Sequence, residues 1–130
     1  MKTLKKISFF LPNFNIGGVE KSFIKMANHF EKKGFKVEIC FIEDDGDLST
    51  KISNKVSKKQ FKSKKLIALL FELRRYFKKD STDIFVSSMY MIGVTAVLSK
   101  LFLKNAPKII IGARSNLTKV IFNSKNIIER

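Results

Sequence analysis

The front of the chain alternates between apolar runs, a glycine loop and a helical pattern, and this order constrains the fold more than any other feature. Mainly apolar runs occupy residues 7–11 and 37–42, and between them lie Gly17-Gly18 and a helical pattern over residues 19–33. Strand, loop, helix and strand in this order predict a parallel strand pair whose loop lies at the carboxyl edge of a sheet. At that edge the first N–H groups of the helix are free to bind an anion or a sugar hydroxyl. We therefore predict a ligand site near the front of the chain.

The same alternation continues to residue 112 and predicts one α/β domain with a Rossmann-like, mainly parallel sheet and helices on both faces. Further helices are predicted over residues 65–78 and 91–103, and further strands over 84–87 and 108–112, with a short additional strand around 52–56. The helix over 91–103 is apolar nearly all round, which predicts that it is covered on all sides. We assign residues 1–118 to this domain and residues 119–130 to the start of another helix or a frayed tail, and we expect no second domain.

Apolar residues at helical spacing mark the buried face of the first two helices. In the first helix they are Val19, Phe23, Met26, Ala27 and Phe30, and Gly34 ends the helix. In the second helix they are Leu66, Leu69, Leu70, Leu73 and Phe77, widened by Ile67 and Phe71. Each helix therefore has a side that can cover the sheet.

The cysteine content and the apolar runs bear on the location of the protein. Cys40 is the only cysteine, so an internal disulfide is excluded, and its place in an apolar strand predicts a buried free thiol. No apolar run reaches the ~20 residues that a membrane-spanning helix needs. The run over residues 7–11 is too short for a secretory signal and leads into the glycine loop. We expect a cytoplasmic protein.

Positive charge is concentrated in the middle of the chain. The formal net charge is +15, and residues 51–79 hold eleven Lys or Arg against one acid, Glu72, which gives this segment a charge of +10. Such a segment favours an anionic partner, which is a membrane surface, a phosphorylated substrate or nucleic acid. The alternative is a basic face that meets only water.

The basic residues flank the apolar stripe of the second helix, and this combination suits peripheral binding to anionic lipid. The residues assigned to the membrane surface are Lys62, Lys64, Lys65, Arg74, Arg75, Lys78 and Lys79. The alternative, which we favour for the stripe itself, is that the stripe covers the sheet while the basic residues face water. Nucleic-acid binding would rest on charge alone, because the chain holds no known recognition motif, and we do not expect it.

The glycine loop and one acidic triplet exclude several classes of ligand. Gly17 and Gly18 are adjacent, so they lack the spacing of the dinucleotide fingerprint G-x-G-x-x-G, and a G-x-x-x-x-G-K phosphate loop is also absent. The two glycines permit close approach of the backbone and a positive φ, and the alternative is a tight turn without a ligand. Asp45-Gly46-Asp47 has spaced carboxylates that suit a divalent cation, but so short a match often arises by chance. We predict no metal site and no cofactor.

Five short motifs, spread from about Lys5 to Thr118, follow one another in an order known from one enzyme family. They are Asn15-Ile16-Gly17-Gly18-Val19-Glu20-Lys21, Ala27-Asn28, Lys33-Gly34-Phe35-Lys36-Val37, Ser87-Ser88 and Ile109-Ile110-Ile111-Gly112-Ala113-Arg114-Ser115-Asn116. They resemble the N-terminal domain of glycosyltransferase family 4. The resemblance implies the GT-B arrangement of two Rossmann-like domains, in which the first mainly receives the acceptor and the second mainly binds the nucleotide-sugar donor.

The family resemblance also implies roles for single residues. It places Gly17 and Gly18 at the cleft between the two domains, near the donor phosphate and the acceptor. Arg114 then either pairs with a phosphate or anchors its loop through carbonyl groups. Asn116 either hydrogen-bonds a sugar hydroxyl or caps a following helix. The implied substrate- and phosphate-binding residues are Asn15, Gly17, Gly18, Arg114, Ser115 and Asn116. No catalytic base is assigned.

We expect the chain to be the acceptor-binding half of a nucleotide-sugar-dependent glycosyltransferase that acts in the synthesis of bacterial surface polysaccharide or lipid-linked glycan. The expected partners are a sugar or lipid-linked saccharide acceptor, the nucleotide-sugar as co-substrate, and the anionic inner face of the cytoplasmic membrane. No donor-binding domain is present, so the resemblance implies a fragment that is inactive alone. The alternatives are a non-catalytic basic module that binds a membrane surface or nucleic acid, and a degenerate remnant of the fold.

Overall fold

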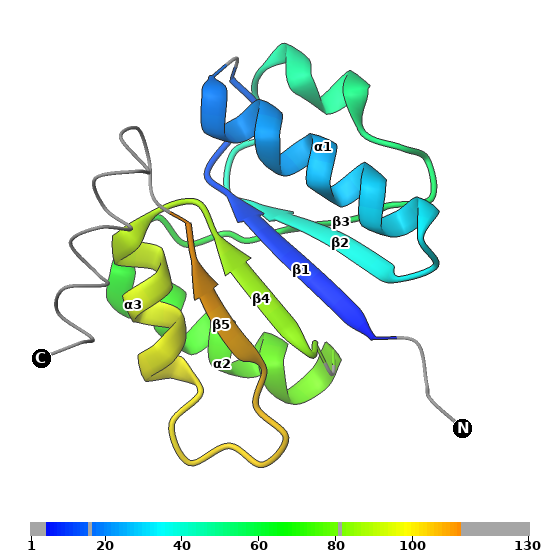
Figure 1. The fold of residues 1–130 in the computed structure, drawn as a ribbon. Helices are drawn as coiled ribbons and strands as arrows, with labels where there is room; N and C mark the ends of the chain where they lie inside the picture. Colours follow the sequence, from blue (N-terminus) through cyan, green and yellow to red (C-terminus); the bar gives the residue numbers. More distant parts are fainter. Residues whose placement is uncertain (1–4, 16, 81, 113–130) are drawn as a thin grey trace, which may run out of the picture.

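The computed structural model describes residues 5–15, 17–80 and 82–112, which form a layered α/β domain (Figure 1). The strands are β1 (Lys6–Leu11), β2 (Lys36–Phe41), β3 (Ser57–Gln60), β4 (Ile84–Ser87) and β5 (Lys108–Ile111). The helices are α1 (Gly18–Lys32), α2 (Leu66–Asp80) and α3 (Tyr90–Ser99), with a short 3-10 helix, η1 (Asp47–Lys51). All strands are parallel, in the order β3-β2-β1-β4-β5. The predicted Rossmann-like α/β fold with a parallel sheet is confirmed.

The direction of each crossover decides which face of the sheet a helix covers. From β1 the chain moves outward through β2 to β3, and it then returns past β1 to β4 and β5. Because connections between parallel strands are right-handed, this reversal moves the later helices to the other face. α1 and η1 lie on one face of the sheet, and α2 and α3 lie on the opposite face (Figure 1). The sheet therefore separates two apolar cores.

Alternate residues of β1 supply these two cores. Phe9 belongs to the core under α1, where its ring lies 5.7 Å from that of Phe23. Phe10 belongs to the other core, where its ring lies 5.5 Å from that of Phe61 and 5.9 Å from that of Phe85. All these rings are buried. Aromatic pairs of this kind each stabilise by about 0.5–1.5 kcal/mol beyond their buried area, so the phenylalanine-rich composition has a direct structural use.

A buried polar network ties β1 and β2 to α2. The hydroxyl oxygen of Ser8 lies 2.7 Å from Tyr76 Oη and 2.9 Å from Thr82 Oγ1, and Tyr76 donates to the carboxylate of Glu38. Lys6 Nζ lies 3.2 Å from the same carboxylate. Burial is the main cause of a raised pKa for Tyr76, so its phenol stays protonated and serves as a donor. Polar groups in a low-dielectric core stabilise a fold only when they are paired, as they are here.

The predicted strand around residues 52–56 is wrong, because the strand that pairs with β2 is β3, a few residues later. Ile52 and Val56 are buried, but they pack into the core under α1 instead of pairing in the sheet. β3 is exposed along its whole length and is held by its backbone pairing to β2. Apolar content is therefore a poor guide here, since an edge strand needs no apolar side chains.

The third helix is shorter and less covered than the sequence predicts. α3 ends at Ser99 instead of Leu103, and Arg74 donates to the carbonyl oxygens of Ser99 and Leu101 at this end. The prediction that this helix is covered on all sides is wrong. Exposed apolar residues along it are Tyr90, Met91, Val97 and Leu98. Within the part of the chain that the structure describes, no helix is both long enough and apolar enough to cross a membrane.

The buried face predicted for the second helix is partly right. Leu69, Leu73 and Phe77 are buried, and Tyr76 joins them. Leu66 is exposed, and so are Ile67 and Phe71, which were predicted to widen the stripe. The narrower stripe covers the sheet, and the remaining apolar residues face outward on the side of α2 that carries its basic residues.

Glu72 of α2 holds the loop between β3 and α2. Its carboxylate accepts hydrogen bonds from Lys62 N–H at 3.0 Å and from Ser63 N–H at 2.8 Å. Partial burial acts to raise the pKa of Glu72, but these hydrogen bonds together outweigh it and keep the pKa below its usual value. A carboxylate with a lowered pKa stabilises the fold above its unfolded-state pKa. That contribution is lost as the pH falls through the folded-state pKa.

We expect Glu72→Gln to lower the free energy of unfolding by about 1 kcal/mol at neutral pH, because the loop loses a charged acceptor. The difference from the unsubstituted chain should shrink as the pH falls below about 4, the usual range of a free glutamate. Urea unfolding at a series of pH values measures this. Glu31→Gln on α1 is the control and should have little effect at any pH. A Glu72→Gln penalty that is independent of pH would contradict the assignment.

Candidate functional site

Three loops meet at the carboxyl edge of the sheet, where β1 and β4 are neighbours and the strand order reverses. They are the glycine loop after β1, the corner after β4, and the end of β5. Ser88 N–H donates to Phe10 O at 3.2 Å, and Gly112 N–H donates to Ser87 O at 2.7 Å. In open parallel sheets the point of reversal forms the crevice in which ligands bind. The segments that the sequence patterns single out are thus brought to one place.

The glycine loop is held by the acidic turn that follows β2. Phe14 N–H donates to Asp45 O at 2.8 Å, and Leu48 N–H donates to Phe14 O at 3.1 Å. Gly46 has a φ of +116°, and a Cβ at this position would collide with the backbone of Phe14. The Phe14 side chain is fully buried, with its ring 4.9 Å from that of Phe41. Glycine is needed at this turn for both its dihedral and its size.

The acidic triplet Asp45-Gly46-Asp47 therefore supports the site through its backbone. Among residues 5–15, 17–80 and 82–112, no group of three or more His, Cys, Asp or Glu side chains is arranged to hold a metal ion. The geometry gives this turn a structural task, which is to fix the position of the glycine loop.

Gly17 and Gly18 begin α1, and neither needs to be glycine for the sake of the fold. Gly17 is the N-cap, with a φ of −151° that any residue adopts. Neither glycine has a positive φ, so the freedom of glycine to adopt one is not used at these two positions. A Cβ on Gly18 would meet no atom within 4 Å, and a Cβ on Gly17 would meet only the movable carboxylate of Glu20. Glycine in a helix is less stable than alanine by up to about 1 kcal/mol, so what Gly18 provides is access to the backbone.

The backbone at this helix start is open. The first helical hydrogen bond runs from Lys21 N–H to Gly17 O at 3.0 Å. The N–H groups of Gly18, Val19 and Glu20 donate to no residue that the structure describes. The Glu20 carboxylate lies against Gly17, near the positive end of the helix dipole. An anionic or hydroxyl-bearing ligand can take the same place once this carboxylate moves aside.

The structure describes one of the remaining predicted binding residues, Asn15, but not those near residue 115. Asn15 is exposed, and its N–H donates to Asn13 Oδ1 at 3.0 Å, which shapes the loop. Arg114, Ser115 and Asn116 lie outside the described residues. The chain reaches them from Gly112, where a Cβ would lie 3.2 Å from Phe23 Cζ of α1.

Ser88 is a further candidate site residue, which the sequence analysis did not assign to the site. Its side chain is buried, and among the buried polar side-chain atoms that the structure describes, Ser88 Oγ is the one without a hydrogen-bond partner. The preceding serine is occupied: Ser87 Oγ donates to Met89 O at 2.7 Å and accepts from Met89 N–H at 3.1 Å. A buried hydroxyl without a partner at the point of strand reversal is a natural contact for a polar ligand. In the sequence the two serines form one motif. Only the hydrogen bonds of the structure distinguish Ser87, which has partners, from Ser88, which has none.

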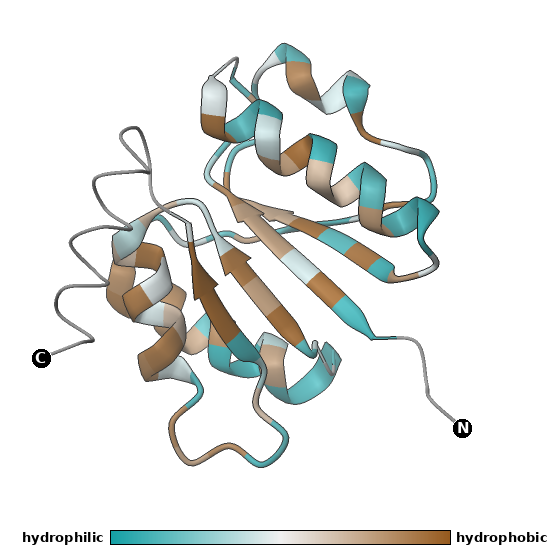
Figure 2. Ribbon diagram, in the orientation of Figure 1, coloured by the Kyte–Doolittle hydropathy of each residue, from teal (hydrophilic) through white to brown (hydrophobic). Residues whose placement is uncertain are grey.

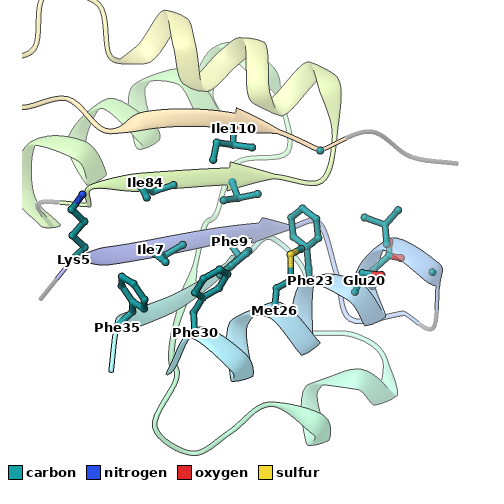
Figure 3. A pocket seen from close by; sticks show the side chains of 15 residues that line it. Lys5, Ile7, Phe9, Glu20, Phe23, Met26, Phe30, Phe35, Ile84 and Ile110 are labelled. Atoms are coloured by element: carbon teal, nitrogen blue, oxygen red, sulfur yellow. The ribbon is translucent and has the colours of Figure 1, made fainter. Parts of the chain in front are cut away.

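An apolar groove of about 980 Å³ opens beside this edge, between α1 and the exposed side of β1, β4 and β5 (Figure 3). Gly18, Val19, Glu20 and Gly112 line its end at the carboxyl edge, and Lys5 and Phe35 line the other end. Its walls between these ends are Ile7, Phe9, Phe23, Met26, Phe30, Ile84, Val86 and Ile110. The glycine loop and the end of β5 therefore border one cavity.

The predicted membrane residues lie on and before α2, remote in sequence from this edge. Lys62, Lys64, Lys65, Arg75, Lys78 and Lys79 are exposed. Arg74 is half-buried, and its guanidinium donates to Leu101 O at 2.8 Å, so it is engaged within the fold. Lys64 pairs with Glu43 at 2.7 Å, but both side chains are well exposed and such pairs contribute little.

These features define an α/β domain of Rossmann-like type with a candidate site at the carboxyl edge of its sheet. No protein-family model matches the chain. A search of curated proteins likewise finds no significantly similar sequence.

Two glycine substitutions distinguish a glycine that only exposes the backbone from a glycine that the fold requires. We expect Gly18→Ala to leave the free energy of unfolding unchanged or to raise it by up to about 1 kcal/mol, because the added methyl meets nothing and helix propensity improves. Gly46→Ala should lower it by at least about 2 kcal/mol, because of strain at positive φ and collision with Phe14. Urea unfolding followed by circular dichroism measures both. Equal losses in the two variants would mean that Gly18 is also structural.

Proposed function

We propose that this chain is the acceptor-side half of a nucleotide-sugar-dependent glycosyltransferase. The observation that carries the proposal is the open start of α1, where Gly18 exposes backbone N–H groups although the fold itself does not need glycine there. A glycine that costs stability and serves no packing purpose is best explained by something that approaches it closely. The sugar-transfer chemistry itself comes from the motif resemblance of residues 15–21 and 109–116.

Two further features support a polar ligand at this edge. Ser88 Oγ is buried without a partner at the reversal point of the sheet. The loop that carries Gly17 is fixed by the Gly46 turn, so the helix start is preorganised instead of being ordered by the ligand. Preorganised donors lose less entropy on binding and can act on charge as it develops.

In the proposed reaction an acceptor hydroxyl is held beside the anomeric carbon of the donor sugar. The bond from that carbon to the nucleotide phosphate breaks as the new glycosidic bond forms. N–H groups of the α1 start and the guanidinium of Arg114 then stabilise the departing phosphate. The donor itself is held mainly by a second domain, so this half contributes positioning and electrostatic stabilisation.

Binding of sugar nucleotides to the 130-residue chain tests the proposal. We expect UDP-glucose, GDP-mannose or another nucleotide-sugar of such a panel to shift the amide resonances of Gly17, Gly18 and Ser88, with a Kd on the order of 1 mM for half a site. Gly18→Val should weaken this binding at least about tenfold by blocking the approach to the backbone. Two-dimensional NMR titration measures both.

The control for the titration is Lys25→Val, which adds a β-branched residue to an exposed position of the same helix. It should bind as the unsubstituted chain does. If no nucleotide-sugar and no saccharide shifts these amides, or if Gly18→Val binds as well as the control, the helix start has no part in binding.

A second function, peripheral binding to an anionic membrane, is favoured by the outer surface of α2 and α3. Figure 2 shows that α3 is apolar over most of its length. Exposed apolar residues of these helices and the turn after α3 are Leu66, Ile67, Phe71, Tyr90, Met91, Val97, Leu98, Leu101 and Phe102. Ile67, Phe71, Arg75 and Lys78 recur at helical spacing on α2, so two apolar and then two basic residues share one face. This composition suits the interface of an anionic bilayer, and it can serve the transferase or act without it.

Phe102 is the most exposed residue of this surface. It is 97% exposed and has a φ of +64°, so both its side chain and its backbone are in unfavourable states. A left-handed conformation costs a non-glycine residue roughly 1–2 kcal/mol. Neither cost is offset by contacts with the described part of the chain. Insertion of the ring into the headgroup region of a bilayer would remove the exposure of the side chain.

Phe102→Gly tests the membrane surface without harming the fold. We expect it to leave the free energy of unfolding within about 1 kcal/mol of the original, since relief of strain offsets the flexibility of glycine. It should weaken binding to vesicles of phosphatidylglycerol by roughly tenfold, because a buried phenyl ring is worth about 1.5–3 kcal/mol. Vesicle co-sedimentation measures this.

Met26→Ser, at an exposed position on the opposite face, is the matched control and should bind vesicles normally. Vesicles of phosphatidylcholine should bind weakly, and salt should reduce binding to the anionic ones. Vesicle binding without any nucleotide-sugar binding would favour the non-catalytic module over the transferase. Equal loss in Phe102→Gly and Met26→Ser would contradict the proposed surface.

A further inference from the structure

The apolar groove beside α1 is incompletely covered by the residues that the structure describes. On its walls Ile110 is 45% exposed and Met26 is 37% exposed, while Ile84 and Val86 are half-buried (Figure 3). The cause is topological, because right-handed crossovers place α2 and α3 on the other face and leave β4 and β5 bare on this one. Apolar surface of this extent between a helix and a sheet needs an occupant.

We propose that the occupant is the segment of residues 117–130 of this same chain, folded as an amphipathic helix. One of its six apolar residues, Phe122, falls on the opposite side of such a helix. The other five recur at helical spacing and are Leu117, Val120, Ile121, Ile127 and Ile128. At 100° per residue they fall within an arc of about 120°, with the small Ser124 among them. The charged residues all lie outside this arc. They are Lys119, Lys125, Glu129 and Arg130.

The length of the segment and its starting point fit the groove. Gly112 directly follows β5 and itself lines the groove, so the segment starts at the correct end. Fourteen residues, 117–130, form a helix of about 21 Å, and the six residues of β1 that floor the groove extend about 20 Å. Residues 113–116 supply the turn, and Asn116 stands at the position of an N-cap.

The charges at the two ends are complementary in this arrangement. The helix starts at the carboxyl edge beside Glu20, where its positive dipole end meets a carboxylate. It ends at the amino edge beside Lys5, where the negative dipole end meets an ammonium group. The reverse orientation would bring like charges together at both ends.

The segment also needs the groove in order to fold. It is rich in β-branched residues and asparagine, which have modest helix propensity, and an isolated helix of this length is marginal in water. Packing against Ile110 and Met26 supplies the missing stabilisation. The inference rests on the groove and the sequence pattern, and it holds whether or not the chain belongs to a sugar transferase.

Hydrogen exchange of the 130-residue chain, measured by NMR or mass spectrometry without added ligand or lipid, tests the proposal. We expect amides of residues 119–128 to exchange at least about tenfold more slowly than in a peptide of residues 113–130. Ile110→Lys, which puts a charge on the groove wall, should remove this protection while leaving α2 and α3 protected. Ile121→Asp should do the same from the other side of the contact.

Leu98→Lys is the matched control, because Leu98 is 49% exposed but lies on α3, on the opposite face. It should leave the protection of residues 119–128 intact. Exchange of this segment at peptide rates in the unsubstituted chain would overturn the proposal. Protection that survives Ile110→Lys, or that appears only at concentrations where sedimentation shows a dimer, would overturn it too, because another surface or a second copy would then be the cause.

Discussion

The right-handed crossover of parallel strands is the constraint on which the rest of this structure depends. Because the strand order reverses between β1 and β4, it places α1 over one half of the sheet and α2 and α3 over the other face. The candidate site at the carboxyl edge lies at that point of reversal. The bare side of β4 and β5 is a result of the same rule. A candidate site and an uncovered groove are thus neighbours for one geometric reason.

Gly46, in the turn that supports the glycine loop, and Gly18, at the start of α1, differ in why glycine is present. Gly46 is demanded by a positive φ and by contact with the Phe14 backbone, so it is part of the scaffold. Gly18 is demanded by neither, and under the proposed function its role is to leave the backbone open to a ligand. The first holds the loop still and the second leaves it open. Fixed position and accessible donors are what the proposed site for a phosphate or a sugar hydroxyl requires.

The sequence predicts this fold well because, over most of the chain, the hydrophobic periodicity and the glycine, proline and asparagine breakers indicate the same elements. The strand over residues 84–87 and the end of α1 before Gly34 fall where the pattern places them. Prediction fails where tertiary context decides. Ile52 and Val56 have the composition of a strand but fill a core, while the polar Ser57–Gln60 pairs with β2.

The candidate site shows the same division. Adjacent glycines after a strand reveal the helix start, since that signal is local. The unpaired hydroxyl of Ser88 leaves no trace in the sequence, because it depends on what Ser87 and the neighbouring strands already bond. The early end of α3 is equally non-local, since the carbonyl groups beyond it are taken by Arg74 from another helix.

The exposed edge strand β3 bears on how the protein avoids association with other copies of itself. It forms one border of the described sheet, and Lys58 and Lys59 stand on it with no apolar neighbour in the strand. Two copies of such a border repel each other, which guards against the edge-to-edge association that open sheets invite. Part of the positive charge of the chain is thereby explained as protection against aggregation, and any sixth strand has its natural place beside β5.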